Sequence, residues 1–307
     1  MIDVKPSGEA CGATVTGVNL TQDLDQETIV QIKQAWWQHH VLAFPDQHLD
    51  NEDLERVSQY FGIFGTEPFF EPMDNSEHVV AVCRRADEKA PLFAPNWHTD
   101  WSFQENPPIG TSLYGVVIPP VGGDTSYANL QLALKKMPDA MRQRFEGLKA
   151  IHSARLAYAP DGTYGDRAEE ADRSMRIIYS DTPYESQVHD LVVTHPDSGN
   201  ETIIGCAGYI IGLEGMAQEQ ASDLLQQLYA WQSREEFQYT HKWQENMLVI
   251  WDNRSVMHRA NGGYDGYDRE LHRTTIYRPE GFLNPESGTV TAFQSSSKAD
   301  SIMPGPH

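Results

Sequence analysis

Three side chains in this sequence have the types and spacing of a metal site. His98 and Asp100 are separated by one residue, and His258 lies far downstream. If His98 and Asp100 lie on a strand, both side chains project from the same face of the sheet. Two imidazoles and one carboxylate form the facial triad of non-haem Fe(II) oxygenases, which leaves coordination positions open. Because a structural zinc site is normally closed, this pattern indicates catalysis.

Two other histidines compete with His258 for the role of the distant ligand. His272 directly precedes Arg273, so on a regular strand the two side chains point to opposite faces. His241 belongs to an alternating apolar stripe that is typical of core packing. The sequence therefore favours His258 as the third ligand.

Two arginines downstream of His258 could bind an anion. Arg269 and Arg273 are four residues apart, so on a regular strand they face the same side. A guanidinium group pairs with a carboxylate through two hydrogen bonds. Acidic neighbours on both sides of Arg269 offer it an alternative, a salt bridge without any ligand. The segment Gly122-Gly123-Asp124-Thr125 predicts a tight turn, after which the Thr125 hydroxyl could reach the same anion.

The elements that must position these residues begin with helices. Residues 22–40 have the apolar periodicity of a helix, and residues 41–44 form a short buried strand. Asp50 is a good N-cap for a second helix. Downstream of Trp97 the pattern changes to strands and turns, with helical segments expected around 138–149 and 216–232.

The segment 236–278 carries the clearest strand pattern. Polar and apolar residues alternate over 237–243, which is typical of a half-buried strand. Residues 244–246 would form a hairpin turn before a buried strand at 247–251, and alternation returns over 271–277. Ligands on separated strands around a pocket predict a mainly β fold with flanking helices, built on a double-stranded β-helix (a cupin-like jelly roll). We expect one domain over residues 1–307, with a core at about 12–280 and a C-terminal extension at 281–307.

Composition limits the partners. The chain of 307 residues has 23 Lys and Arg against 44 Asp and Glu, a net charge of −21. This charge repels phosphate backbones and anionic lipids, so we predict no nucleic-acid or membrane partner. The three cysteines form no disulfide or metal-binding pattern, and the N-terminus has no signal-like apolar segment. These features favour a cytoplasmic protein with a small-molecule substrate, and they leave a homo-oligomer possible.

The sequence resembles the TauD/TfdA family of Fe(II)- and 2-oxoglutarate-dependent dioxygenases. The similarity extends from about Gly12 to Arg278, and the motifs occur in the family's order. Several coincident motifs are far more specific than any single one. The matching segments are Trp97–Asp100, Gly122–Thr125, Thr194–Pro196, Ile250–Arg254, and His258 followed by Arg269 and Arg273.

The resemblance implies a role for each matched residue. His98, Asp100 and His258 would bind iron and form the catalytic centre. Thr125 and Arg269 would hold the distal carboxylate of 2-oxoglutarate, and Arg273 would lie between the co-substrate and the primary substrate. O2 would be the second co-substrate, and succinate and CO2 would be products. Because Asp100 is a carboxylate where related halogenases have a smaller residue, hydroxylation is the implied outcome.

The substrate is less closely defined. Aligning Phe61-Gly62 with the family places Glu67 where taurine-oxidising members have a sulfonate-binding histidine, and Ala94 where they have an asparagine. A carboxylate repels a sulfonate and attracts an amine, which argues against taurine. We expect a small organic acid or zwitterion, with bond cleavage if the hydroxylated carbon bears oxygen, nitrogen or sulfur. A biosynthetic hydroxylase of an amino-acid derivative and a non-catalytic jelly-roll binding protein are the alternatives.

Overall fold

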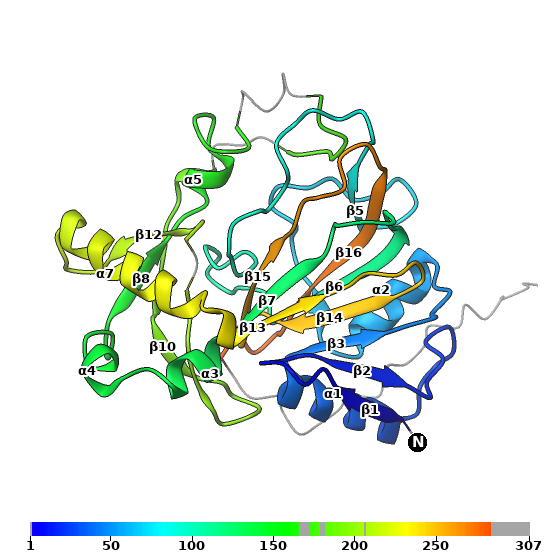
Figure 1. The fold of residues 1–307 in the computed structure, drawn as a ribbon, viewed down its shortest axis with the longest axis horizontal. Helices are drawn as coiled ribbons and strands as arrows, with labels where there is room; N and C mark the ends of the chain where they lie inside the picture. The colour runs from blue at the N-terminus through cyan, green and yellow to red at the C-terminus, as the bar shows by residue number, and fades with distance from the viewer. Residues whose placement is uncertain (1, 166–171, 179–181, 206, 284–307) are drawn as a thin grey trace, which may run out of the picture.

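The computed structural model describes residues 2–165, 172–178, 182–205 and 207–283. Most of the predicted C-terminal extension therefore lies outside the described residues. Two sheets built from the segments around the predicted ligands dominate the described part (Figure 1). The large sheet has the strand order β1 (Asp3–Pro6), β2 (Ala13–Thr16), β3 (Val41–Phe44), β14 (Leu248–Asp252), β6 (Gly110–Val117), β16 (Arg269–Tyr277) and β4 (Ile63–Phe64), with β5 (Val80–Arg84) also paired to β16. The small sheet has the order β13 (Gln238–His241), β7 (Thr125–Asn129) and β15 (Val256–Ala260).

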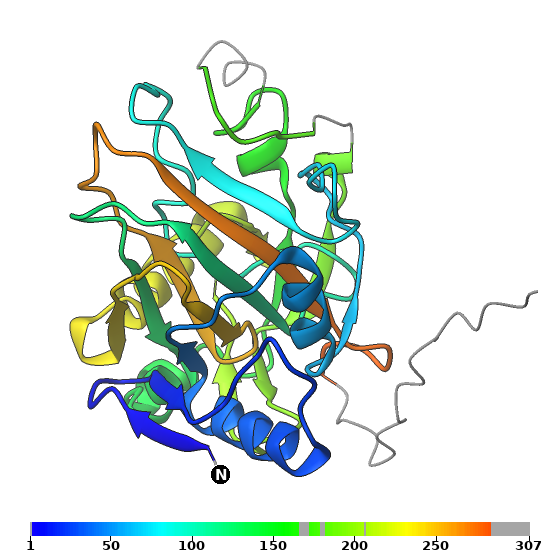
Figure 2. The same ribbon diagram turned by 90° about the vertical axis from the view of Figure 1, so that its right-hand side faces the viewer.

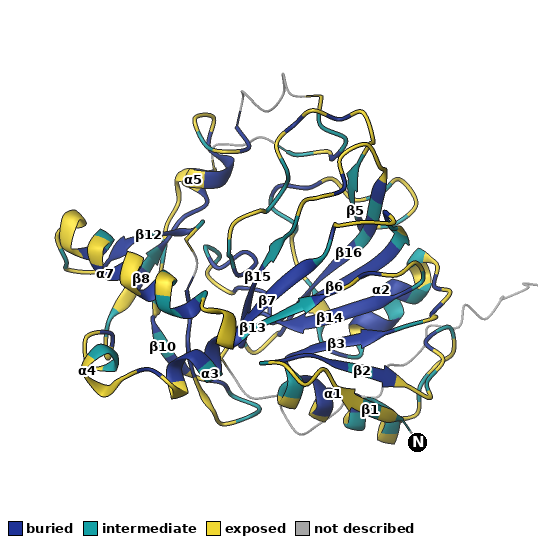
Figure 3. Ribbon diagram, viewed as in Figure 1, coloured by how far each residue is buried: buried dark blue, intermediate teal, exposed yellow. Residues whose placement is uncertain are grey.

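Buried side chains from both sheets pack against each other. One hydrophobic cluster joins Leu113, Val249 and Trp251 of the large sheet to Tyr127 and Val256 of the small one. The central strands of both sheets, among them β3, β14, β6 and β7, are mostly buried, whereas the edge strand β1 is largely exposed (Figure 3). The predicted mainly β, jelly-roll architecture is confirmed, and its interior is the place where residues of the two sheets meet.

The N-terminal helices cover the outer face of the large sheet (Figure 2). Helix α1 (Gln26–His39) starts at Asp25, whose side chain accepts a hydrogen bond from the Thr28 backbone. Helix α2 (Asn51–Gln59) starts at Asp50, which accepts from the Asp53 backbone, as its sequence predicts. Trp36 of α1 is 1% exposed within a core cluster that includes strand and α2 side chains.

The second half of the chain adds a peripheral layer. Two further small sheets are present, one of β12 (Ile210–Leu213), β8 (Lys149–His152) and β9 (Gln187–Asp190), the other of β10 (Val192–Thr194) and β11 (Glu201–Ile203). The remaining helices within the described residues are α3 (Leu130–Lys135), α4 (Asp139–Arg142), α5 (Arg155–Tyr158), α7 (Gln218–Gln232) and the 3-10 turns η1 (Thr182–Tyr184) and η2 (Glu235–Phe237). Within the described residues, no helix has the length and apolar character needed to cross a membrane.

Two sequence-based expectations about these elements are wrong. The helix expected around 138–149 is a single turn, α4, followed by hydrogen-bonded turns. Gly147, with a positive φ of 72°, ends these turns shortly before β8 begins. The hairpin expected around 244–246 is absent, since β13 pairs with β7 whereas β14 pairs with β3 and β6. Residues 244–246 instead carry the chain from the small sheet to the large one. The helix expected at 216–232 is confirmed as α7.

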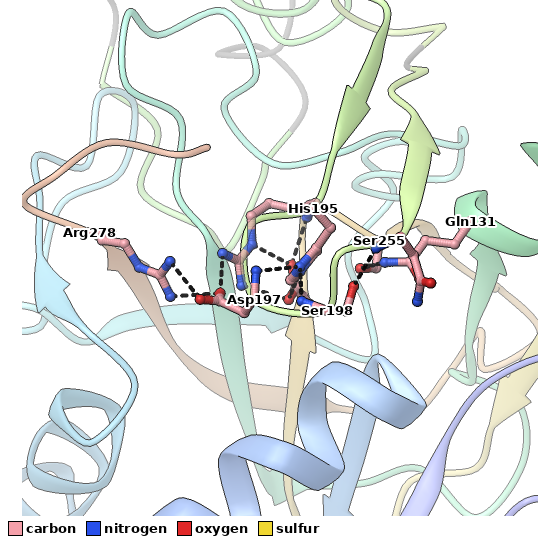
Figure 4. A network of polar contacts seen from close by, with 9 residues as sticks. Gln131, His195, Asp197, Ser198, Ser255 and Arg278 are labelled. Carbon is pink, nitrogen blue, oxygen red and sulfur yellow. Dashed lines mark hydrogen bonds and ion pairs between the residues drawn. The ribbon is translucent and has the colours of Figure 1, made fainter. Parts of the chain in front are cut away.

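A buried ionic network fixes the turn between β14 and β15 (Figure 4). Asp252 accepts from His195 Nε2 at 2.9 Å and pairs with Arg254 Nη2 at 2.8 Å. Arg254 Nη1 and Arg278 Nη2 each donate to Asp197 Oδ2 at 2.8 Å. Burial alone would raise the pKa of Asp252, but Arg254 and His195 outweigh it and hold that pKa well below its usual range. Asp252 and Arg254 thus have a structural role.

Asp252→Asn should lower the free energy of unfolding by about 3 kcal/mol, because it weakens a fully buried charge pair and leaves Arg254 with one counterion. Urea unfolding measures the loss. Asp190→Asn is the matched control, since its ion pair with Lys149 is about half exposed, and it should cost less than about 1 kcal/mol. Equal effects of the two substitutions would contradict a stabilising role for the network.

Candidate metal centre and co-substrate cavity

The three predicted ligands meet where a loop crosses β15. His98 and His258 form an isolated antiparallel bridge, in which each backbone N–H donates to the other residue's carbonyl, at 2.9 and 2.8 Å. The expectation that His98 and Asp100 share a strand is therefore wrong. The chain leaves the bridge at once, because Trp101 adopts a positive φ of 44°. The bridge nonetheless brings the loop's ligands to the strand's ligand.

The ligand atoms of His98, Asp100 and His258 lie within 4.8 Å of one another. Asp100 Oδ1 is 3.7 Å from His98 Nε2 and 3.9 Å from His258 Nε2. His98 Nδ1 lies 2.9 Å from the Asn96 carbonyl, which makes Nδ1 the donor and leaves the Nε2 lone pair for a metal. The group has the donor set and the convergence that a single ion requires.

The charge states also suit a divalent metal. Burial, and then the nearby His98, lower the pKa of His258 to about 3, and burial lowers the pKa of His98. Burial would raise the pKa of Asp100, but Arg273 and the two imidazoles outweigh it and bring that pKa to about 2. At neutral pH the site therefore offers two neutral imidazoles and one carboxylate, the forms that bind metals.

The three predicted ligands line a cavity, and alternate residues of strand β16 line it too. Arg269, Leu271 and Arg273 face the cavity. His272 points away and lies within hydrogen-bonding distance of Asn51 and Glu270, at 2.7 and 3.0 Å. The predicted alternation is confirmed, and it excludes His272 from the metal group. His241 contacts the Tyr239 hydroxyl at 2.9 Å and is also absent from the described residues that line the cavity.

Arg269 and Thr125 line the same cavity and have spare hydrogen-bonding capacity. Arg269 Nη2 donates to the Gly123 carbonyl at 3.0 Å, while its buried Nε has no partner among the described residues. Thr125 Oγ1 accepts from Trp243 Nε1 at 3.0 Å, so its own hydrogen is free to be donated. Gly122 supplies the tight turn, since a Cβ there would lie 2.5 Å from the Gly263 backbone. An orphaned guanidinium N–H beside a free hydroxyl is a site for an anion.

Arg273 stands between this cavity and a second one that opens beside it. Its Nη2 is 3.3 Å from Asp100 Oδ1, and its guanidinium lies 4.8 Å from the centre of the Trp101 ring. The second cavity also borders His98 and Asp100, and aromatic side chains form much of its wall. Those aromatic residues are Phe93, Trp101, Tyr158, Tyr164 and Tyr209.

The structure does not support a substrate-binding role for Glu67. Its carboxylate accepts hydrogen bonds from Trp101 Nε1, at 3.1 Å, and from the Thr275 hydroxyl. Among the described residues that line the two cavities, Glu67 is absent. The loop alignment placed this residue near the substrate, but its charge is used to hold the Trp101 indole. Ala94 borders both cavities, where its small side chain leaves room.

Sequence reasoning missed a contact to the carboxylate ligand. Thr111 Oγ1 donates to Asp100 Oδ2 at 2.7 Å from strand β6. No motif or spacing marks this threonine, because the contact exists only once β6 lies beneath the loop. The aromatic wall was missed for the same reason, since its residues come from several separate segments of the chain.

Together the jelly roll and its two-histidine, one-carboxylate group define a class of protein, the mononuclear non-haem iron oxygenases. Comparison with known proteins narrows this class. Residues 3–275 match the family model described as taurine catabolism dioxygenase TauD, TfdA family. The chain belongs to this family.

Individual relatives agree with this assignment. The chain is 30% identical over 266 residues to an alkylsulfatase of Acinetobacter baylyi, which covers 86% of this chain and 81% of the relative. It is 30% identical over 276 residues to an alpha-ketoglutarate-dependent sulfate ester dioxygenase of Pseudomonas putida, covering 90% and 89%. A crystal structure of a taurine dioxygenase from Burkholderia xenovorans superposes with a TM-score of 0.73 at 30% identity, covering 91% and 94%.

The protein is thus an Fe(II)- and 2-oxoglutarate-dependent dioxygenase, an oxidoreductase that uses O2 and acts on a small molecule. The prediction of this reaction class is confirmed. The alternative of a non-catalytic binding protein is excluded by family membership together with the converged donor set.

His98→Ala should weaken Mn(II) binding by more than the roughly 10–100-fold that loss of an outer-sphere partner costs, because one of three donors is removed. Calorimetric titration measures the affinity, and circular dichroism checks the fold. His272→Ala, which removes an imidazole from the opposite face of β16, should bind Mn(II) like the unmodified protein. Unchanged affinity in His98→Ala would contradict the metal assignment.

Proposed function

We propose that His98, Asp100 and His258 bind the catalytic Fe(II) through Nε2, Oδ1 and Nε2. The three atoms converge on one point and have the charge states that the metal requires. When bound, iron and 2-oxoglutarate would activate O2, which on its own reacts too slowly with a C–H bond. The protein's contribution is to position the reactants and to keep water away from the reacting carbon.

We propose that Arg269 and Thr125 bind the distal carboxylate of 2-oxoglutarate. The buried Nε of Arg269 and the free Thr125 hydrogen lie in the cavity that also holds the metal ligands. A carboxylate there satisfies both donors, and burial strengthens the pairing because water does not compete. The co-substrate is then held at both ends, which fixes its direction relative to the metal.

Arg269→Leu should raise the KM for 2-oxoglutarate by about 10- to 100-fold, since a charge-assisted hydrogen bond contributes about 1.5–3 kcal/mol. Succinate formation at varied 2-oxoglutarate concentration measures it. Arg56→Leu is the control, because this partly buried arginine binds the Leu20 carbonyl outside the sheet and should leave KM unchanged. An unchanged KM in Arg269→Leu would show that the co-substrate lies elsewhere.

We propose that the aromatic cavity binds an anionic substrate whose charged group faces Arg273. Arg273 is the one Arg or Lys among the described residues that line this cavity. Its buried Nη2 forms an ion pair with Asp100 Oδ1 at 3.3 Å but makes no hydrogen bond within the described residues. Aromatic walls fit an apolar tail. The Glu67 carboxylate already accepts hydrogen bonds from Trp101 and Thr275, which argues against its binding an amine. These contacts favour an anion over a zwitterion.

The relatives suggest which anion to test. Two of them are named for alkyl sulfates or sulfate esters, substances that join an anionic head to an apolar tail. We therefore propose hydroxylation of the carbon that bears the sulfate oxygen. One oxygen atom of O2 enters succinate and the other becomes the new hydroxyl group. The hydroxylated carbon then loses sulfate as the C–O bond breaks and the hydroxyl proton leaves, giving an aldehyde.

Incubation with hexyl sulfate, Fe(II), O2 and 2-oxoglutarate should yield hexanal and sulfate in a one-to-one ratio with succinate. The products are measured by chromatography, with phenoxyacetate and taurine as alternative substrates. Sulfate release without 2-oxoglutarate would indicate hydrolysis and contradict the proposal. Succinate formed with phenoxyacetate or taurine but not with hexyl sulfate would replace the proposed substrate class.

The biosynthetic alternative predicts a stable hydroxylated product, and the same assay separates the two because only cleavage releases an aldehyde. A cytoplasmic location stays a prediction. The exclusion of nucleic-acid and membrane partners also stays a prediction, and the net charge of −21 supports it.

A further inference from the structure

The two oxygens of Asp100 have different surroundings. Oδ1 faces His98, His258 and Arg273 at 3.7, 3.9 and 3.3 Å. Oδ2 points the other way and accepts a hydrogen bond of 2.7 Å from Thr111 Oγ1. Thr111 lies on β6, in the middle of the large sheet, and is completely buried. Thr111 therefore holds the carboxylate through Oδ2, the oxygen that faces away from the two histidines.

Further hydrogen bonds fix the direction of the Thr111 hydroxyl. Trp251 Nε1, which can only donate, donates to Asn253 Oδ1 at 3.0 Å. This assigns the Asn253 amide nitrogen to the opposite side, where it donates to Thr111 Oγ1 at 3.2 Å. Because Thr111 accepts there, its single hydrogen is free for Asp100. The chain of donors runs in one direction, from the indole to the carboxylate.

Trp251, the first donor in this series of hydrogen bonds, is buried and also contacts a second predicted metal ligand. Thr111 and Trp251 are directly paired across β6 and β14, and both are 0–1% exposed. The Trp251 ring centre also lies 4.6 Å from that of His258. His258 Nδ1 is buried without a hydrogen-bond partner in the described residues, so ring packing must orient this imidazole. One indole thus packs on His258 and, through Asn253 and Thr111, orients Asp100.

We propose that Thr111 is a positioning residue that presents Asp100 to the metal through Oδ1 alone, with Asn253 and Trp251 holding its hydroxyl in place. A carboxylate that could turn would offer both oxygens to the metal and occupy a position that a co-substrate needs. The inference rests on the proposed role of Asp100 as a ligand. It concerns the geometry of binding, not the charge of the group.

The test compares three variants of the full chain. Thr111→Val keeps the shape of the side chain and removes the hydroxyl, whereas Thr111→Ser keeps the hydroxyl. Thr274→Val, on the neighbouring strand β16, is the matched control. Its fully buried hydroxyl contacts Ser58 of α2 at 2.7 Å and Ser112 of β6 at 2.6 Å. Mn(II) affinity is measured by calorimetry, the Co(II) environment by visible absorption, and folding by circular dichroism.

Thr111→Val should bind Mn(II) about 10- to 100-fold more weakly and alter the Co(II) spectrum, as loss of an outer-sphere partner does. Thr111→Ser should restore both properties, and Thr274→Val should leave both unchanged. Folded Thr111→Val with the affinity and spectrum of the unmodified protein would overturn the inference while leaving the metal site intact. Absence of Mn(II) binding by the unmodified protein would instead overturn the metal assignment, and this inference with it.

Discussion

Two backbone hydrogen bonds, between His98 and His258, join a loop to strand β15 and thereby bring the three metal ligands together. Each of the other features supports this one contact. The buried pair of Asp252 with Arg254 fixes the turn from which β15 begins. The Thr111 hydroxyl reaches Asp100 from below the loop. A bridge of two residues is a weak structure on its own, so its surroundings must hold both sides in register.

The cavity beside the metal group carries positive charge. The protein carries a net charge of −21, yet arginines line the cavity beside the metal group. Arg273 lies 3.3 Å from Asp100, and the pair has almost no contact with water. In such surroundings a guanidinium attracts anions far more strongly than at the surface. A positive cavity in a negative protein would favour a small anion, in agreement with the proposed anionic substrate.

Local patterns in the sequence were sufficient to predict the position of several residues of this site. Alternation along β16 identified the inward arginines and the outward His272, and Asp50 was recognisable as a helix cap because capping is a local interaction. Contacts between distant segments were not predictable in the same way. Alternation alone does not say which sheet a strand joins, so β13 and β14 were wrongly paired. The loop alignment that suggested Glu67 as a substrate contact carries no information about the Trp101 indole, which donates a hydrogen bond to its carboxylate. Thr111 has no local signature at all.

The most direct test of the assembled site is an anaerobic titration of the iron-loaded protein with 2-oxoglutarate, followed by visible absorption. We expect a weak charge-transfer band that saturates at one equivalent of co-substrate. A 2-oxo acid can chelate Fe(II) only at the coordination positions that the three protein ligands leave open. A band would show that the metal bound by His98, Asp100 and His258 keeps open coordination positions for the co-substrate, in the cavity that Arg269 lines. Folded, iron-loaded protein that develops no band with excess 2-oxoglutarate would contradict the proposed co-substrate site.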